Sequence, residues 1–90
     1  MEKLTCILNG DEGGLENIYD KIAVDLKFPN YFGRNLDALD ECLCQDVESG
    51  EIIWQNSERA KVSLGEKFEK MVSIFENATL ENTGFKFSLN

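Results

Sequence analysis

Three short apolar segments, each separated from the next by a stretch long enough to hold a helix, constrain the fold of this chain most strongly. They are LTCILN at Leu4–Asn9, the run Ile52–Trp54, and the alternating run Phe85–Leu89. Each has the length and the apolar content of a buried strand. Antiparallel hairpins need only a few linking residues, whereas parallel strands need long crossovers. The spacing therefore predicts an α/β fold with a three-stranded parallel sheet and right-handed helical connections.

The segments between these strands carry apolar residues at helical spacing. The predicted helices are marked by Leu15, Ile18, Ile22 and Leu26; by Leu36, Leu39 and Leu43; and by Leu64, Phe68, Met71, Val72 and Phe75. The first should end before Pro29, because a residue that precedes proline resists the helical conformation. Residues 56–61 are polar and are predicted to be irregular or to form a short helical turn. We expect one domain over residues 1–90.

Negative charge is concentrated in one part of the chain. The net charge is −8, and the segment from Asn35 to Glu58 contains no lysine or arginine. Its seven acids are Asp37, Asp40, Glu41, Asp46, Glu48, Glu51 and Glu58. Such a segment is either a solvated face that keeps the protein soluble or a docking surface for a basic partner. It would repel nucleic acid, so direct binding to DNA or RNA is not expected.

The helix predicted after Asn35 has two opposed faces. Asn35 is a suitable N-cap, and Asp37 falls in the first turn, where the helix dipole favours an anion. The three leucines at positions 36, 39 and 43 form the inward stripe. The outward stripe, at i, i+3, i+4 and i+7, consists of Asp37, Asp40, Glu41 and Cys44.

The residue types present argue against an enzyme, a metal site or a cofactor. The chain has no histidine, which excludes Ser-His and Cys-His nucleophilic sites. Cys42 and Cys44 are two positions apart, so on a helix they point in nearly opposite directions and cannot hold one metal ion. An acid–base pair of Asp37 and Glu41 would lie on an exposed helix with no pocket around it. We therefore expect no catalytic residue.

Two further features concern where the protein is found. No run of 18 apolar residues is present, so no membrane span is expected. The apolar stretch near the N-terminus is too short for a secretory signal, and the odd count of three cysteines indicates reduced thiols. We expect a cytoplasmic protein.

The segment FPNYFGRNLDAL at residues 28–39, followed by Cys42 and Leu43, resembles the barstar family of ribonuclease inhibitors. The hallmark of that family is a proline, two aromatic residues, a glycine and then Asn-Leu-Asp-Ala-Leu. The resemblance implies a barstar-like domain with helices packed on one face of the sheet. It further implies an immunity-like or antitoxin-like inhibitor, monomeric when free. Such an inhibitor binds a basic ribonuclease or nuclease toxin one-to-one, its acidic helix and preceding loop mimicking substrate phosphates in the active site.

The resemblance and the outward stripe together give the candidate partner-binding residues. These are Tyr31, Gly33, Asn35, Leu36, Asp37, Asp40, Glu41, Cys44, Asp46, Glu76 and Asn77. Two positions at which the family has tryptophan are Asp40 and Asp46 here, and the family's glutamate in the last helix falls on Asn77, beside Glu76. An alternative function remains open, in which the acidic surface binds a basic protein that is not a nuclease.

Overall fold

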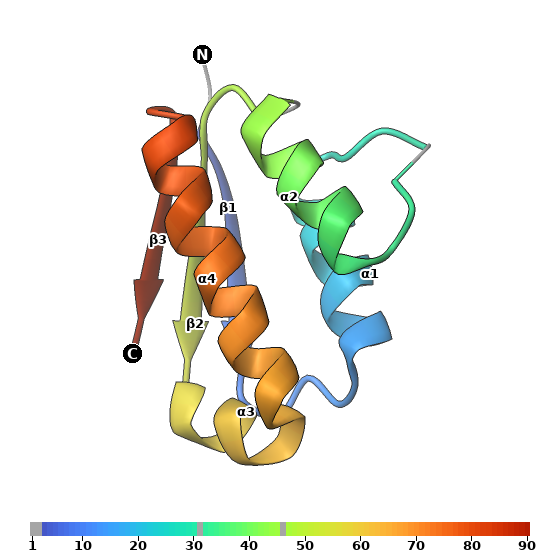
Figure 1. Cartoon of the computed structure of the whole chain (residues 1–90), viewed down its shortest axis with the longest axis vertical. Helices are drawn as coiled ribbons and strands as arrows, with labels where there is room; N and C mark the ends of the chain where they lie inside the picture. Colours follow the sequence, from blue (N-terminus) through green and yellow to red (C-terminus); the bar gives the residue numbers. More distant parts are fainter. Residues whose placement is uncertain (1–2, 31, 46) are drawn as a thin grey trace.

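The computed structural model describes residues 3–30, 32–45 and 47–90. Tyr31 and Asp46, two of the candidate residues, lie outside the described residues. The elements follow one another along the chain in the order shown in Figure 1. They are β1 (Leu4–Asn9), α1 (Leu15–Asp25), α2 (Leu36–Gln45), β2 (Gly50–Gln55), α3 (Ser57–Leu64), α4 (Glu66–Glu81) and β3 (Phe85–Leu89).

The three strands form one parallel sheet, as the spacing of the apolar segments predicts. The strand order is β1-β2-β3, so β2 lies in the centre. Cys6 of β1 pairs with Ile52 of β2, which pairs with Phe87 of β3. The predicted bounds of the first and last strands are confirmed, and the central strand is longer than the apolar run Ile52–Trp54 at both ends.

The helices cover one face of this sheet. Figure 1 shows α1, α2 and α4 on the same side of the three strands. Side chains alternate accordingly, since Cys6, Leu8 and Ile52 are fully buried while Ile7 is 46% exposed. The predicted arrangement of helices on one face is confirmed. No helix of the described residues is long and apolar enough to cross a membrane.

Aromatic side chains fill the centre of the core. Trp54 of β2 is fully buried, and its ring centroid lies 4.9 Å from that of Phe68 and 6.0 Å from that of Phe75, both in α4. Phe75 also contacts Phe87 of β3, at 4.8 Å between centroids. These edge and tilted ring contacts fix α4 against the sheet and add to the stabilisation from burial.

The segment after β2 differs from the prediction. Residues 57–64 form the helix α3, which bears out the helical alternative predicted for residues 56–61 over the irregular one, although the helix is longer than a short turn. Asn56 adopts a left-handed conformation (φ 53°) that turns the chain out of β2, and the buried Ala60 anchors α3. Gly65, with φ 61°, then separates α3 from α4. Leu64 therefore belongs to α3 rather than to the long last helix.

Candidate functional site

Helix α2 has the two faces that its sequence predicts. Leu39 and Leu43 are fully buried, and Cys42 is only 3% exposed. Asp37 and Glu41 are exposed, and Asp40 is half-buried. The apolar side is anchored in the core, so the carboxylates are held on a fixed backbone rather than on a mobile loop.

The first turn of α2 is capped by Asn35, as predicted. The N–H of Ala38 donates a hydrogen bond to the Asn35 side-chain oxygen at 2.8 Å. The Leu39 N–H donates to the Asn35 main-chain oxygen at 2.9 Å, which begins the helical ladder. The Asn35 side-chain amide donates back to the Gly33 oxygen at 3.3 Å. One side chain thus satisfies an orphan N–H of the helix and fixes the loop before it.

The loop between α1 and α2 is held against α1 by a charged contact. Arg34 forms an ion pair with Asp20 and donates a second hydrogen bond to the main-chain oxygen of Glu16 at 3.4 Å. The hydrogen bond to Asp20 raises the pKa of Arg34, because it favours the charged guanidinium. Arg34 has a left-handed backbone (φ 55°), and these contacts hold it in that conformation.

Aromatic packing fixes the same loop. Phe32 is half-buried, and its ring lies edge-on to Tyr19 of α1 at 5.9 Å and to Phe28 at 5.0 Å between centroids. Phe32 therefore joins the loop to the core.

The other end of α2 is held by Asn82, at the end of α4. The Asn82 side-chain amide donates to the oxygens of Leu43 at 2.9 Å and Val47 at 2.6 Å. Its side-chain oxygen accepts from the Gly84 N–H at 2.9 Å. Asn82 therefore ties together α2, the link to β2 and the turn before β3.

Asp37, Asp40 and Glu41 form a carboxylate face on α2, and Cys44 lies beside it. The half-buried Cys44 thiol donates to Asp40 at 3.6 Å. Burial raises the pKa of Cys44, and the charges of Asp40 and Glu81 raise it further, so the thiol stays neutral. Glu81 thus lies close enough to α2 to add a carboxylate from α4. Sequence patterns within α2 could not reveal Glu81, because its position depends on the packing between two helices.

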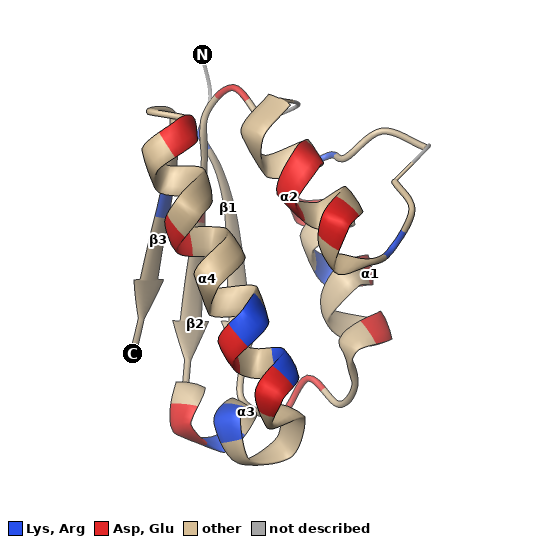
Figure 2. Cartoon of the chain, viewed as in Figure 1, with Lys and Arg blue, Asp and Glu red and all other residues tan. Residues whose placement is uncertain are grey.

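The acid-rich segment of the sequence is not one surface. Figure 2 shows acidic positions on α2, and others distributed over the rest of the chain. Glu51 of β2 forms an ion pair with Lys3 at 2.9 Å, and Glu58 lies on α3. Among the described acids of that segment, Asp37, Asp40 and Glu41 are the three that α2 carries.

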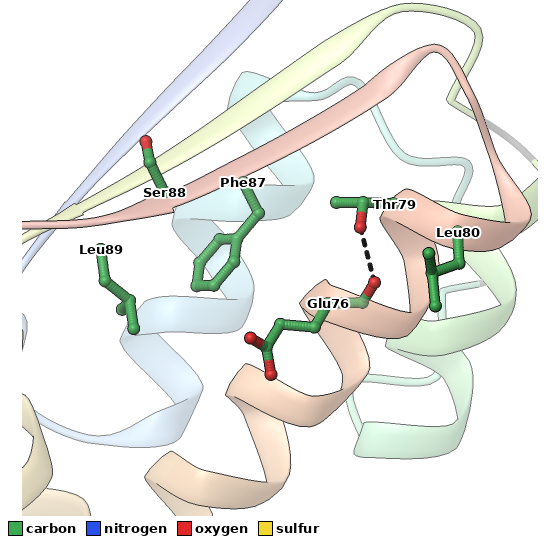
Figure 3. A pocket seen from close by; sticks show the side chains of 6 residues that line it. All are labelled: Glu76, Thr79, Leu80, Phe87, Ser88 and Leu89. Carbon is green, nitrogen blue, oxygen red and sulfur yellow. Dashed lines mark hydrogen bonds between the residues drawn. The ribbon is translucent and has the colours of Figure 1, made fainter.

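Glu76 and Asn77, the two neighbouring candidates on α4, have different surroundings in the structure. Figure 3 shows Glu76 in a groove between α4 and β3, where it lies beside Phe87 and Leu89. Asn77 is exposed, and it shares a stripe of α4 with Glu81 four residues later. Asn77 is not among the residues that line this groove.

The remaining candidates surround the start of α2. Gly33 is exposed, and a Cβ added there would lie 3.4 Å from that of Ala38. Leu36 is half-buried and packs against the core, so only part of its side chain is accessible. In the described part of the chain, no group of three or more Cys, Asp or Glu residues could hold a metal ion.

Comparison with known proteins gives a consistent result. The family model for barstar, the barnase inhibitor, matches residues 8–90. A Bacillus subtilis (strain 168) protein named "Putative ribonuclease inhibitor YrdF" is 32% identical over 77 residues. That match covers 83% of this chain and 85% of the relative. Together with the parallel sheet, the capped acidic helix and the aromatic loop before it, these matches show that the chain belongs to the barstar family.

Proposed function

We propose that this protein inhibits a small basic ribonuclease, whose active site it blocks with α2 and the loop before α2. Family membership and the name of the Bacillus subtilis relative support the ribonuclease inhibitor role. We further propose that residues 1–90 act as one domain in the cytoplasm, as a monomer that binds one enzyme molecule.

The observation that carries this proposal is that the carboxylates on α2 have no cationic partner among the described residues. Asp37, Asp40 and Glu41 form no ion pair within 4 Å among the described residues. Their helix is fixed at both ends, by Asn35 and by Asn82. The helix backbone that carries these carboxylates is therefore fixed before a partner binds, which lowers the entropic cost of binding.

The chemistry of a ribonuclease active site matches this face. Such a site holds phosphates with cationic side chains, and a carboxylate can replace a phosphate oxygen as the acceptor of charge-assisted hydrogen bonds. Asp37 and Glu41 are one helical turn apart, so they can reach adjacent cationic groups. Asp40 and Glu81 add further negative charge, which would favour a ribonuclease whose active site has more cationic side chains.

Inhibition can be tested with barnase and a panel of other small basic ribonucleases. The wild-type protein should stop hydrolysis of a fluorogenic RNA substrate and bind one of these enzymes at a one-to-one ratio in calorimetry. The isosteric double variant Asp37→Asn/Glu41→Gln should weaken that binding by at least about a hundredfold, since desolvated charge pairs of this kind contribute 2–5 kcal/mol or more.

A matched control removes the same two charges elsewhere. Glu58 on α3 and Glu69 on α4 are exposed. The double variant Glu58→Gln/Glu69→Gln should bind almost as tightly as the wild-type protein. Equal losses in the two double variants would contradict the assignment of the site to α2. A wild-type protein that inhibits no enzyme of the panel, but captures a basic non-nuclease protein, would favour the alternative function.

A further inference from the structure

A cleft opens next to the start of α2, on the side of α4. It has a volume of about 670 Å³, and its lining residues come from α1, from the start of α2 and from α4. Helix α2 has ten residues and α4 has sixteen, so α2 is shorter by roughly 9 Å. Figure 1 shows that α2 begins beside the middle of α4. The space between α1 and the first turns of α4 is therefore not filled by α2.

The floor of this cleft is apolar, and the charges on one of its walls are paired within the protein. Leu15 and Leu36 are half-buried and Tyr19 is buried, so the floor is apolar. On the wall nearest α1, Arg34 forms an ion pair with Asp20 and also interacts electrostatically with the carboxylate of Glu16. The charges of that wall are thus largely compensated within the protein.

The opposite wall carries two cations that are not compensated in this way. Lys67 and Lys70 of α4 both line the cleft, and both are exposed. Neither forms an ion pair within 4 Å in the part of the chain that the structure describes. Glu66 lies one helical turn before Lys70 but does not pair with it. Figure 2 shows basic positions in the first half of α4, whereas the acids of α2 lie beside its second half.

The cleft is continuous with the carboxylate face, because Asp37 belongs to both. A partner that covers α2 would also cover the lysines. We propose that Lys67 and Lys70 receive a carboxylate-bearing loop at the rim of the partner ribonuclease's active site, an inference that rests on the proposed function. The contact surface then has an acidic end and a basic end, which together fix one orientation of the enzyme.

Charge reversal tests this inference by the sign of its effect. Against a uniformly basic partner, the variant Lys67→Glu/Lys70→Glu adds favourable charge and should bind more tightly. Against a partner with an acidic group at this cleft, the same variant places like charges together and should bind more weakly. The neutral variant Lys67→Ala/Lys70→Ala should change affinity in the same direction by a smaller factor.

The matched control is Lys61→Glu/Lys86→Glu, which changes the net charge equally on α3 and on β3. Both control lysines are exposed and lie outside the cleft. The probe is the ribonuclease of the panel that the wild-type protein binds most tightly. We expect the cleft variant to bind that enzyme at least about tenfold more weakly than the control variant.

Three other outcomes would overturn the inference. If the cleft variant binds as tightly as the control, or more tightly, while Asp37→Asn/Glu41→Gln still loses affinity, this inference fails and the proposed function stands. If the double acid variant also retains its affinity, the α2 contact surface is wrong as well. If the wild-type protein binds no ribonuclease of the panel, the proposed function and this inference fail together.

Discussion

The side-chain amide of Asn82 donates a hydrogen bond to the main-chain oxygen of Leu43, across 39 positions of sequence and at 2.9 Å. The last carbonyls of a helix have no partner within the helix, so this bond satisfies one of them. It also sets the position of α2 relative to α4. The geometry of the carboxylate face therefore depends on a residue that is not on it.

Replacement of Asn82 by alanine should destabilise the fold. The variant loses the bonds to Leu43, Val47 and Gly84, and it leaves partly buried groups without partners. At about 1 kcal/mol for each bond, the free energy of unfolding should fall by roughly 2–3 kcal/mol. Urea denaturation followed through the fluorescence of Trp54, the only tryptophan, measures this. Asn77→Ala, at an exposed position of α4, should change stability by no more than about 0.5 kcal/mol. Equal effects would contradict the bridging role.

Removal of the cap at Asn35 should cost less. Asn35→Ala loses the acceptor for the Ala38 N–H, so the free energy of unfolding should fall by about 1 kcal/mol. Asn35→Asp keeps an acceptor at that position and should retain most of the stability. Thermal unfolding of the three proteins checks the order. If Asn35→Asp is as unstable as Asn35→Ala, the hydrogen bond to Ala38 does not account for the loss.

Salt should slow the association of this protein with a basic ribonuclease. Asp37, Asp40 and Glu41 attract a cationic active site over several ångströms, and salt screens that attraction beyond about 8 Å at physiological ionic strength. Stopped-flow association rates should fall by at least about tenfold between 25 mM and 500 mM sodium chloride, a range on the scale over which steering is screened. The variant Asp37→Asn/Glu41→Gln should show a shallower dependence. Identical slopes would exclude these two carboxylates from the steering of the partner.

Alkaline pH should destabilise the protein through Cys6. Burial, together with the nearby Asp25, raises the pKa of this thiol to about 12 from an ordinary value of 9.0. The folded state therefore favours the neutral thiol. Its contribution to stability is complete below pH 9 and is lost as the pH rises from 9 toward 12, because the unfolded chain ionises first. Tyr19, whose pKa burial also raises, acts in the same direction.

Urea midpoints measured between pH 8 and pH 10.5 should fall in the wild-type protein. Cys6→Ala should be less stable at pH 8 because of the cavity that it leaves, but its midpoint should depend less on pH. The comparison is between slopes, so the cavity does not affect it. Parallel pH profiles would show that Cys6 does not control alkaline stability.

Patterns of neighbouring residues in the sequence predicted those parts of the fold that depend on interactions within one helix or strand. Apolar and polar residues alternate along the segment Phe85–Leu89, and the structure gives the strand the same bounds. Asn35 caps α2 because its side chain needs only the next turn of the chain. The full length of helix α3 was not predicted, because its sequence is polar and has one buried residue, Ala60. Its stability depends on contacts with α4 rather than on an apolar stripe of its own.

The candidate site shows the same limit. The outward carboxylates of α2 follow from a period of 3.6 residues, so sequence alone could place Asp37 and Glu41. The rotation of α4 could not be predicted to within one residue, which is why Glu76 and Asn77 could not be separated. Glu81 and the lysine pair of α4 become neighbours of α2 only through packing, so no short motif contains them.

The two faces of α2 also bear on how such a protein can change over generations. Leu39 and Leu43 fill the core, whereas the exposed Asp37 and Glu41 make no contact that the core needs. Substitutions on the outer face therefore leave folding nearly intact, and mutual repulsion among the carboxylates means that some of them would even favour it. Successive single replacements on this face can therefore change the charges that a partner meets, without passing through an unfolded intermediate protein.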